Sequence, residues 1–265
     1  NMDFGNGIGN VGVYSVGGGT ATNTGTITIG ASNAATNAFG IGMAAGYQNS
    51  DTGNVINNGT INVNGDYSIG MYASGAGSTA TNGGNIVLNA NNTTGIYADN
   101  GATAINRGTI TTSGSHSKVV GVYLGKGATL NNTGTIHIDS DNGTGIYLKG
   151  GIVANYGTIT VAGGAKREAE FTTPPTGKEV GGVSIDAPAG AQTATITVNG
   201  VPQIPTVVNT TGRNPISVSA SSIGLYVNTS GVNYTRSIDG LQNLTSEADL
   251  IIGNEAAEST NSKYI

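Results

Sequence analysis

The chain contains no cysteine and no tryptophan, and only 9% of its residues are charged and 5% aromatic. The missing cysteine excludes disulfide bonds, thiol catalysis and cysteine-ligated metals. It also agrees with an exported bacterial protein that does not rely on oxidation. The net charge of −5 and the lack of a basic patch argue against a nucleic-acid partner. No apolar run approaches the ~20 residues of a membrane-spanning helix.

No signal peptide is visible at the start of the chain, and the first residues already lie within a repeating pattern. We therefore expect a fragment of a longer protein. What the chain does contain is 45 glycines, many asparagines and threonines, and regularly spaced isoleucine and valine. A disordered chain usually carries more charge and less regular apolar patterning. This composition favours short β-strands joined by tight turns.

Two short sequence marks recur along the chain, and such repeats indicate a stacked architecture. The first is Gly-apolar-Tyr, with weaker copies at Gly42 and Gly182. Its clear copies begin at Gly12, Gly70, Gly95, Gly121, Gly145 and Gly224. The second is Gly-Thr-Ile, with variants at Gly84-Asn85-Ile86 and Ala194-Thr195-Ile196. Its clear copies begin at Gly25, Gly59, Gly108, Gly134 and Gly157.

Apolar residues within each mark alternate with other residues, which is the pattern of a strand and not of a helix. Val120, Val122 and Leu124 share one face around the first mark, and Ile136 and Ile138 share one face in the second. A third short apolar position precedes each Gly-Thr-Ile mark by four residues. Each unit therefore has about three strands and three turns. Units this short bury a core only by stacking, which predicts a parallel β-helix of about eight coils.

An asparagine lies two residues before the glycine in every clear Gly-Thr-Ile mark and in the variant at Gly84. Asparagine tolerates the left-handed backbone of a tight turn, and stacked amides can bond their neighbours in adjacent coils. We expect a structural asparagine ladder at a bend, with no ligand role. Its members are Asn23, Asn57, Asn82, Asn106, Asn132 and Asn155.

Three stretches interrupt the repeat. Residues 31–39 are small and polar and indicate a loop, and residues 201–215 hold three prolines. Residues 163–181 are rich in charge around Pro174-Pro175, which predicts a protruding insertion. The tail at residues 241–265 contains the run Leu250-Ile251-Ile252, which suits a further strand, while residues 246–250 also suit a helical turn. No linker divides the chain, so we expect residues 1–265 to form a single β-helical domain.

The tyrosines of the first mark should form one external column, because their neighbours at even spacing point inward. The column consists of Tyr14, Tyr72, Tyr97, Tyr123, Tyr147 and Tyr226. Tyr97, Tyr123 and Tyr147 are candidate contacts for a glycan or protein, since tyrosine offers a large rigid surface. The alternative is that tyrosine simply favours strands and stacks on its like.

The insertion is the second candidate for partner contact, because binding residues concentrate on loops that a rigid scaffold holds. The alternative is a tolerated loop without a role. Its candidate residues are Lys166, Arg167, Glu168, Phe171, Lys178 and Glu179.

Chemical sites are sparse in the rest of the sequence. The acids Asp99, Asp139 and Asp141 lie in expected turns, and nothing fixes the pair of carboxylates that glycoside chemistry requires. Asp139-Ser140-Asp141-Asn142-Gly143 resembles half of a calcium loop but lacks the bidentate glutamate. His116 and His137 do not form a metal site by themselves. Threonine pairs such as Thr109/Thr111 suggest an ice-binding face, but several coils lack them. We expect no enzyme activity, no metal and no cofactor.

The marks Thr94-Gly95-Ile96-Tyr97-Ala98 and Asn132-Thr133-Gly134-Thr135-Ile136 resemble the passenger regions of bacterial type V autotransporters. The closest resemblance is to the very large fusobacterial outer-membrane adhesins, the RadD-like and galactose-sensitive group. The segment Gly224–Asn228 and the tail around Glu247–Gly253 carry the more specific part of it. The resemblance covers essentially the whole chain. It implies a right-handed β-helix on the cell surface, exported by a signal peptide and anchored by an outer-membrane barrel outside this chain.

The resemblance further implies a monomeric adhesin that binds a host-cell receptor protein, a glycan or the surface of other bacteria. No binding motif transfers residue by residue, so the adhesion site stays unassigned at this stage. Two alternatives remain open. One is a polysaccharide-processing β-helix of the tailspike or lyase type, and the other is a spacer that makes no contact itself.

Overall fold

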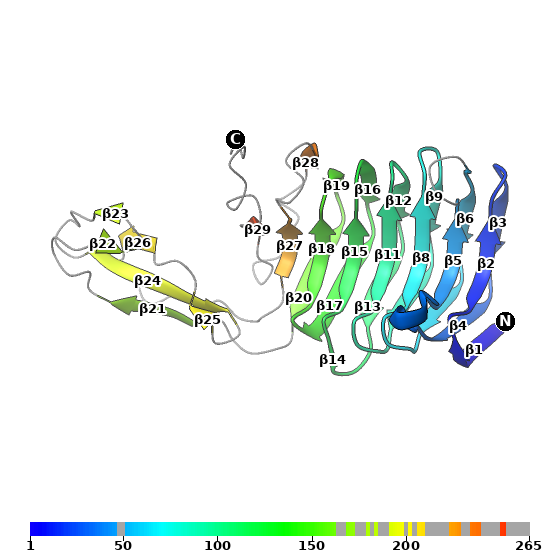
Figure 1. Ribbon diagram of the computed structural model, residues 1–265, viewed down its shortest axis with the longest axis horizontal. Helices are drawn as coiled ribbons and strands as arrows, with labels where there is room; N and C mark the ends of the chain where they lie inside the picture. The colour runs from blue at the N-terminus through cyan, green and yellow to red at the C-terminus, as the bar shows by residue number, and fades with distance from the viewer. Residues whose placement is uncertain are drawn as a thin grey trace. The chain divides into compact units, whose positions relative to one another are not determined.

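A computed structural model describes residues 1–46, 51–162, 223–228 and 234–239. It also gives the backbone of the strands within residues 168–209 and of residues 250–252. The chain divides into two compact units, Gly164–Ser221 and the remainder. The larger unit is a right-handed parallel β-helix built from three sheets (Figure 1). The prediction of an all-β parallel solenoid is confirmed.

The first sheet, here the tyrosine sheet, contains the strands of the Gly-apolar-Tyr marks. Its order is β2 (Val11–Ser15), β5 (Ile41–Ala45), β8 (Ile69–Ser74), β11 (Thr94–Asp99), β15 (Val120–Leu124), β18 (Thr144–Leu148), β27 (Ile223–Val227) and β29 (Leu250–Ile252).

The second sheet is here called the asparagine sheet. Each of its strands except β28 ends on one of the asparagines of the predicted ladder. It is formed by β3 (Thr20–Asn23), β6 (Asn54–Asn57), β9 (Thr79–Asn82), β12 (Thr103–Asn106), β16 (Ala128–Asn132), β19 (Gly151–Asn155) and β28 (Arg236–Asp239).

The third sheet is here called the isoleucine sheet. Each of its strands except β1 and β14 begins directly after the glycine of a Gly-Thr-Ile mark or its variant. It is formed by β1 (Met2–Ile8), β4 (Thr26–Ala31), β7 (Thr60–Val63), β10 (Asn85–Leu88), β13 (Thr109–Thr112), β17 (Thr135–Asp141) and β20 (Thr158–Ala162), with the short β14 (His116–Ser117) beside β17.

The interior is a continuous apolar core because equivalent residues of successive coils are paired in register. Ile110 pairs with Ile136 and Ile136 with Ile159, and all three side chains are fully buried. Val122 and Leu124 of the tyrosine sheet belong to the same core, as the alternation predicts. The prediction for Val120 was wrong: its side chain is only partly buried and the preceding Val119 lies in the core instead, because the regular alternation does not extend to the first residue of β15. Each coil thus buries its apolar face against its neighbours.

Glycine is required at the start of the tyrosine strands because the backbone approaches two neighbours closely there. A Cβ atom placed on Gly121 would lie 2.5 Å from the carbonyl oxygen of Gly145 and 2.6 Å from Cγ2 of Ile136. Gly95 is equally confined, by Gly121 and Ile110. This close approach explains why the mark begins with glycine in every coil.

Six coils have all three strands, fewer than the predicted eight. The chain leaves the solenoid after β20 and returns with β27 and β28, and β29 then adds an eighth strand to the tyrosine sheet. The copy at Gly182 was wrongly counted as a coil. It lies beside β23 (Val183–Ser184), which pairs antiparallel with β22 (Glu179–Val180). A three-residue mark is too short to separate parallel from antiparallel strands.

The smaller unit is antiparallel where its backbone is described. Strand β24 (Ala191–Val198) pairs with β21 (Glu168–Thr172), β25 (Val201–Pro202) and β26 (Thr206–Asn209). The variant mark at Ala194-Thr195-Ile196 lies in β24, so its assignment to a parallel coil was wrong. The predicted interruptions at 163–181 and 201–215 fall almost entirely within this unit. The single-domain assignment itself stays a prediction.

The predicted loop at residues 31–39 contains one turn of 3₁₀-helix, η1 (Ala34–Thr36). The Asn33 side chain caps it by accepting a 3.1 Å hydrogen bond from the backbone N–H of Ala35. Asn37 then adopts a left-handed conformation and ends the turn. Phe39 lies at the end of this loop, just before β5, and its side chain is 40% exposed.

Candidate binding face on the tyrosine sheet

Five tyrosine rings form an uninterrupted stack on the outside of the tyrosine sheet. They belong to Tyr72, Tyr97, Tyr123, Tyr147 and Tyr226, which are paired in register in five consecutive strands. Successive ring centroids are 5.6, 4.4, 5.3 and 5.1 Å apart, and the ring planes lie within 28° of each other. The spacing follows from the ~4.8 Å separation of neighbouring strands.

The stack is shorter than the six-membered column that the sequence predicts. Tyr14 lies in register with Ala44 of β5, and Ala44 lies in register with Tyr72. Because Ala44 has no ring, Tyr14 is separated from the stack and is 50% exposed. Its hydroxyl donates a 3.4 Å hydrogen bond to the carbonyl oxygen of Gly46. Tyr72 is therefore the first ring of the stack.

Two rings in the middle of the stack, those of Tyr97 and Tyr123, have a raised pKa. Burial raises the pKa of Tyr97 well above the usual tyrosine value, and the nearby Tyr123 and the carboxylate of Asp99 raise it further. Burial also raises the pKa of Tyr123.

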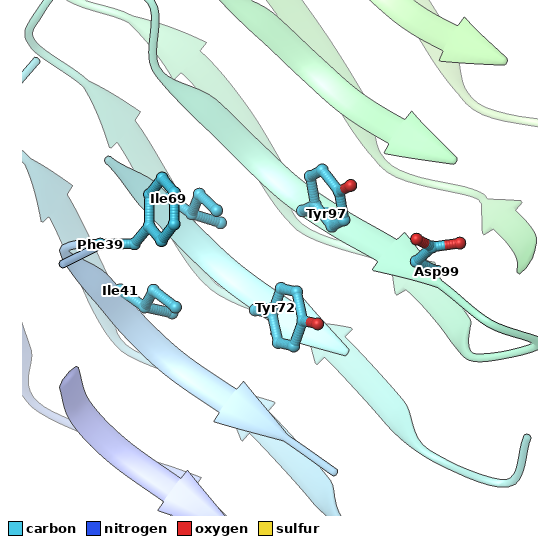
Figure 2. A pocket seen from close by; sticks show the side chains of 6 residues that line it. All are labelled: Phe39, Ile41, Ile69, Tyr72, Tyr97 and Asp99. Carbon is cyan, nitrogen blue, oxygen red and sulfur yellow. The ribbon is translucent and has the colours of Figure 1, made fainter. Parts of the chain in front are cut away.

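A pocket of about 320 Å³ opens beside the first two rings (Figure 2). It is lined by Phe39, Ile41, Ile69, Tyr72, Tyr97 and Asp99. Ile41 and Ile69 are register partners at the starts of β5 and β8. Asp99 is the last residue of β11, and Figure 2 shows it beyond the ring of Tyr97, on the side of the two hydroxyl groups. Phe39, Ile41, Ile69 and Asp99 were not identified as site residues from the sequence, since the pocket depends on contacts between coils.

The six predicted ladder asparagines form a continuous chain of side-chain hydrogen bonds. Each Nδ2 donates to the Oδ1 of the equivalent asparagine in the next coil, over 2.8 Å from Asn23 to Asn57, 2.9 Å from Asn57 to Asn82, 2.9 Å from Asn82 to Asn106, 2.7 Å from Asn106 to Asn132 and 2.6 Å from Asn132 to Asn155. All six side chains are buried, so these bonds satisfy amides that would otherwise be unpaired.

The backbone at the ladder is not left-handed, contrary to the expectation from turn chemistry. None of the six asparagines has a positive φ; among the residues that the structure describes, the left-handed asparagines are Asn37, Asn92, Asn100 and Asn142. The ladder residues instead end extended strands. Their carbonyl groups accept hydrogen bonds from the next coil, as when Asn106 accepts from the N–H groups of Thr133 and Gly134 at 2.8 and 3.0 Å. Asparagine is needed here for its side-chain amide.

The structure describes only some of the candidate residues of the insertion. Lys166, Arg167 and Lys178 lie outside the described residues. Glu168 and Phe171 belong to β21, and Glu179 belongs to β22. Their role in partner contact stays a prediction.

The three acids that the sequence places in turns lie in strands instead. Asp99 ends β11 and Asp139 and Asp141 lie in β17, which is extended by pairing with β14. The resemblance to a calcium loop therefore has no matching loop geometry. His116 donates from Nε2 to the carbonyl oxygen of Ser113 at 2.7 Å. Within the part of the chain that the structure describes, no three histidine or acidic side chains form a group suited to a metal ion.

The threonine pairs do not form a continuous flat face. The column that begins at Thr28 continues through Asn62, Val87, Thr111 and His137. An ordered array for binding ice requires regular spacing of like groups, which this column lacks.

Among the described residues, no helix has the length and apolar character needed to cross a membrane.

Comparison with known proteins identifies the family. No curated protein and no solved structure matches the chain. The family model of the BigA third pectate lyase-like domain matches it twice, over residues 5–109 and 91–181. The two overlapping matches together cover more than half of the 265 residues, and a stack of similar coils explains why one model fits in two positions. The chain therefore belongs to the BigA third pectate lyase-like domain family.

Proposed function

We propose that this chain is part of a bacterial surface adhesin, in which a rigid β-helix presents contact surfaces to host cells or other bacteria. The family supports a surface location, because domains of the BigA type occur in bacterial surface proteins. The marks quoted above support the narrower assignment to type V autotransporter passengers of the fusobacterial kind. The partner in this proposal is a receptor protein or a glycan, bound by a monomeric passenger.

The observation that carries the proposal is the tyrosine face. The core of the solenoid is filled by its own apolar residues, so the stack of five rings is not needed to close the interior. Aromatic side chains on a rigid scaffold bind partners with little loss of conformational entropy. Contiguous apolar surface of this kind marks interaction sites on extracellular proteins.

A polysaccharide-processing enzyme is the second candidate, because the family description is pectate lyase-like. Glycosidases need two carboxylates facing one bond. In the solenoid, Asp99 lies at the end of a tyrosine strand, whereas Asp139 lies on the isoleucine sheet. Asp139 and Asp141 share one strand of that sheet, two residues apart, whereas the pocket beside the tyrosine stack has Asp99 as the single acid in its lining. The pocket therefore holds no pair of carboxylates, which favours binding over cleavage there.

Adhesion assays with the whole chain separate the candidates. The chain is coated on a surface, and retention of host cells, of bacterial cells and of a glycan panel is measured. We expect saturable retention that falls when Tyr97 and Tyr147 are both replaced by alanine. Tyr156→Ala is the matched control, since Tyr156 is 57% exposed and lies outside the stack. Release of new reducing or unsaturated ends from the glycans would support the enzyme instead.

A spacer without contacts of its own is the third candidate. In that case the coated chain retains no cells, and neither the tyrosine variant nor deletion of residues 163–181 changes the result. Loss of retention on deletion of that segment alone would place the contact in the insertion and not on the tyrosine face.

A further inference from the structure

We propose that the pocket beside Tyr72 binds a quaternary ammonium group of the choline type. Three properties of the pocket lead to this ligand: its aromatic and aliphatic walls, its single acidic residue, and the absence of hydrogen-bond acceptors from the side chains of Phe39, Ile41 and Ile69. The proposal goes beyond the adhesive function and does not depend on it, so either can fail without the other.

The walls suit a cation that carries methyl groups. Phe39 and Tyr72 supply two aromatic rings, and one face of Tyr72 is not covered by another tyrosine. Tyr97 contributes only its ring edge and hydroxyl, because Tyr72 and Tyr123 stack on its two faces. Ile41 and Ile69 supply aliphatic surface (Figure 2). The face of an aromatic ring attracts a cation through its quadrupole, and this attraction grows as water is excluded. The methyl groups of a quaternary ammonium also gain from contact with the isoleucines.

The charge of the pocket selects a cation over an anion. Asp99 is the only ionised residue in the lining, and no lysine or arginine accompanies it. A carboxylate at the rim repels acidic sugars and phosphates and attracts a positive charge. A uronic acid polymer, which the family description would suggest as a ligand, therefore does not fit this pocket.

The apolar side of the pocket favours a quaternary ammonium over a lysine or arginine side chain. An ammonium or guanidinium group has several N–H donors that need acceptors when they are desolvated. The acceptors in the lining are the Asp99 carboxylate, whose Oδ1 accepts a 2.7 Å hydrogen bond from the backbone N–H of Asn100, and the hydroxyls of Tyr72 and Tyr97; the other three lining side chains are apolar. A quaternary ammonium has no N–H donor, so nothing is left unsatisfied when it enters.

The position of the pocket follows from the break in the tyrosine stack. Each ring from Tyr97 to Tyr147 has a stacked ring on both sides, whereas Tyr72 is stacked only on Tyr97. The preceding coil places Ala44 in register with Tyr72, and Phe39, just before β5, lines the pocket there. The pocket therefore opens at the end of the stack, where a ring is not covered by another tyrosine.

Titration with small cations tests the proposal. Choline chloride and tetramethylammonium chloride are added to the whole chain, with sodium chloride at equal concentration as the reference, and binding is followed by calorimetry and by tyrosine ring signals in NMR. 3,3-Dimethyl-1-butanol is the neutral isostere of choline. We expect saturable binding of both cations and about 10-fold weaker binding of the isostere, the difference that a desolvated cation–π contact supplies.

Variants assign the binding to the pocket. Tyr72→Phe keeps the ring and should retain binding, while Tyr72→Leu and Phe39→Leu should each weaken it about 10-fold. Asp99→Asn should weaken binding of the cations and leave the isostere unchanged. Tyr156→Leu is the matched control for loss of a tyrosine elsewhere. Because Phe39 lies in a loop, its variant remains informative if Tyr72→Leu fails to fold.

Vesicles distinguish the sources of the group. Co-sedimentation with phosphatidylcholine vesicles but not with phosphatidylglycerol vesicles would identify a lipid headgroup, and binding of free choline without vesicle binding would identify a soluble choline compound. Equal affinity for the neutral isostere, or cation binding that Tyr72→Leu and Phe39→Leu leave unchanged, would overturn the proposal. Absence of saturable binding in the millimolar range would overturn it as well.

Discussion

The side-chain amide of Asn106 donates a 2.7 Å hydrogen bond to the side-chain oxygen of Asn132, one coil further along, and both side chains are fully buried. Asn106 also accepts a 2.9 Å bond from Asn82, so it connects two neighbours. A buried amide that loses its partner keeps the cost of its desolvation. The stability of the solenoid should therefore be sensitive to replacement of an asparagine at the centre of the ladder.

Replacing Asn106 with alanine should therefore destabilise the solenoid by about 2–4 kcal/mol, because it leaves a donor of Asn82 and an acceptor of Asn132 without a partner. Asn131→Ala is the matched control, since Asn131 is the exposed neighbour of Asn132 in the same strand. Denaturant unfolding followed by circular dichroism measures both. Equal losses in the two variants would contradict the structural role of the ladder.

Ile136 and Ile152 test which face of the strands points inward. Ile136 is fully buried in the core, whereas Ile152 on β19 is 48% exposed. Ile136→Ala should cost about 2–5 kcal/mol, as large-to-small core changes do. Ile152→Ala should cost well under half of that. Thermal melts of the two variants, which undergo the same chemical change, give the comparison directly; a larger loss at Ile152 would reverse the assigned faces.

Gly121 tests the close approach at the start of the tyrosine strands. Gly121→Ala places a methyl group 2.5 Å from the carbonyl oxygen of Gly145, which the backbone can accommodate only by shifting. We expect a loss of about 1–3 kcal/mol, typical of overpacking. Gly5→Ala serves as control, because the nearest atom to its new methyl group is the flexible end of Asp3 at 3.1 Å. A melting temperature unchanged by Gly121→Ala would rule out the packing described.

The tyrosine stack should make stability fall in alkaline solution. The raised pKa of Tyr97 means that the folded protein retains this proton while the unfolded chain loses it above about pH 10. The unfolded state then binds fewer protons, so the free energy of unfolding decreases as the pH rises from about 10 toward the folded pKa. Below pH 10 this contribution is constant.

Ultraviolet absorption of ionised tyrosine measures the effect. The wild-type chain should show tyrosines that titrate later than the free amino acid, and Tyr97→Phe should remove one of the late groups. It should also reduce the loss of stability in alkaline solution. Identical titration curves for the two proteins would show that Tyr97 is not buried as described.

The regular part of the fold was predictable because its rules act over a few residues. Alternation at Val122 and Leu124 placed the core correctly, and the fixed interval of two residues before glycine located Asn106 and its equivalents. The inference that failed was the backbone conformation of those asparagines. Asparagine suits left-handed turns in general, but here its amide serves the contact between coils.

The coil count and the pocket depend on contacts that no short pattern contains. Val183 follows a glycine as Val122 does, yet it lies in an antiparallel pair within the other unit. The replacement of tyrosine by Ala44 was visible in the sequence, but its effect on the stack requires the neighbouring coils. Phe39 reaches the pocket only because its loop folds back before β5.

Because equivalent residues of neighbouring coils are paired in register, the solenoid can be lengthened or shortened without disturbing this pairing only by whole coils. Adding or removing one complete coil, such as the stretch between Gly95 and Gly121, keeps every column aligned and changes the reach by one strand spacing, about 4.8 Å. A change of one residue would instead turn core side chains outward. A surface protein built this way can alter its height above the cell in equal steps while the rest of its structure is preserved.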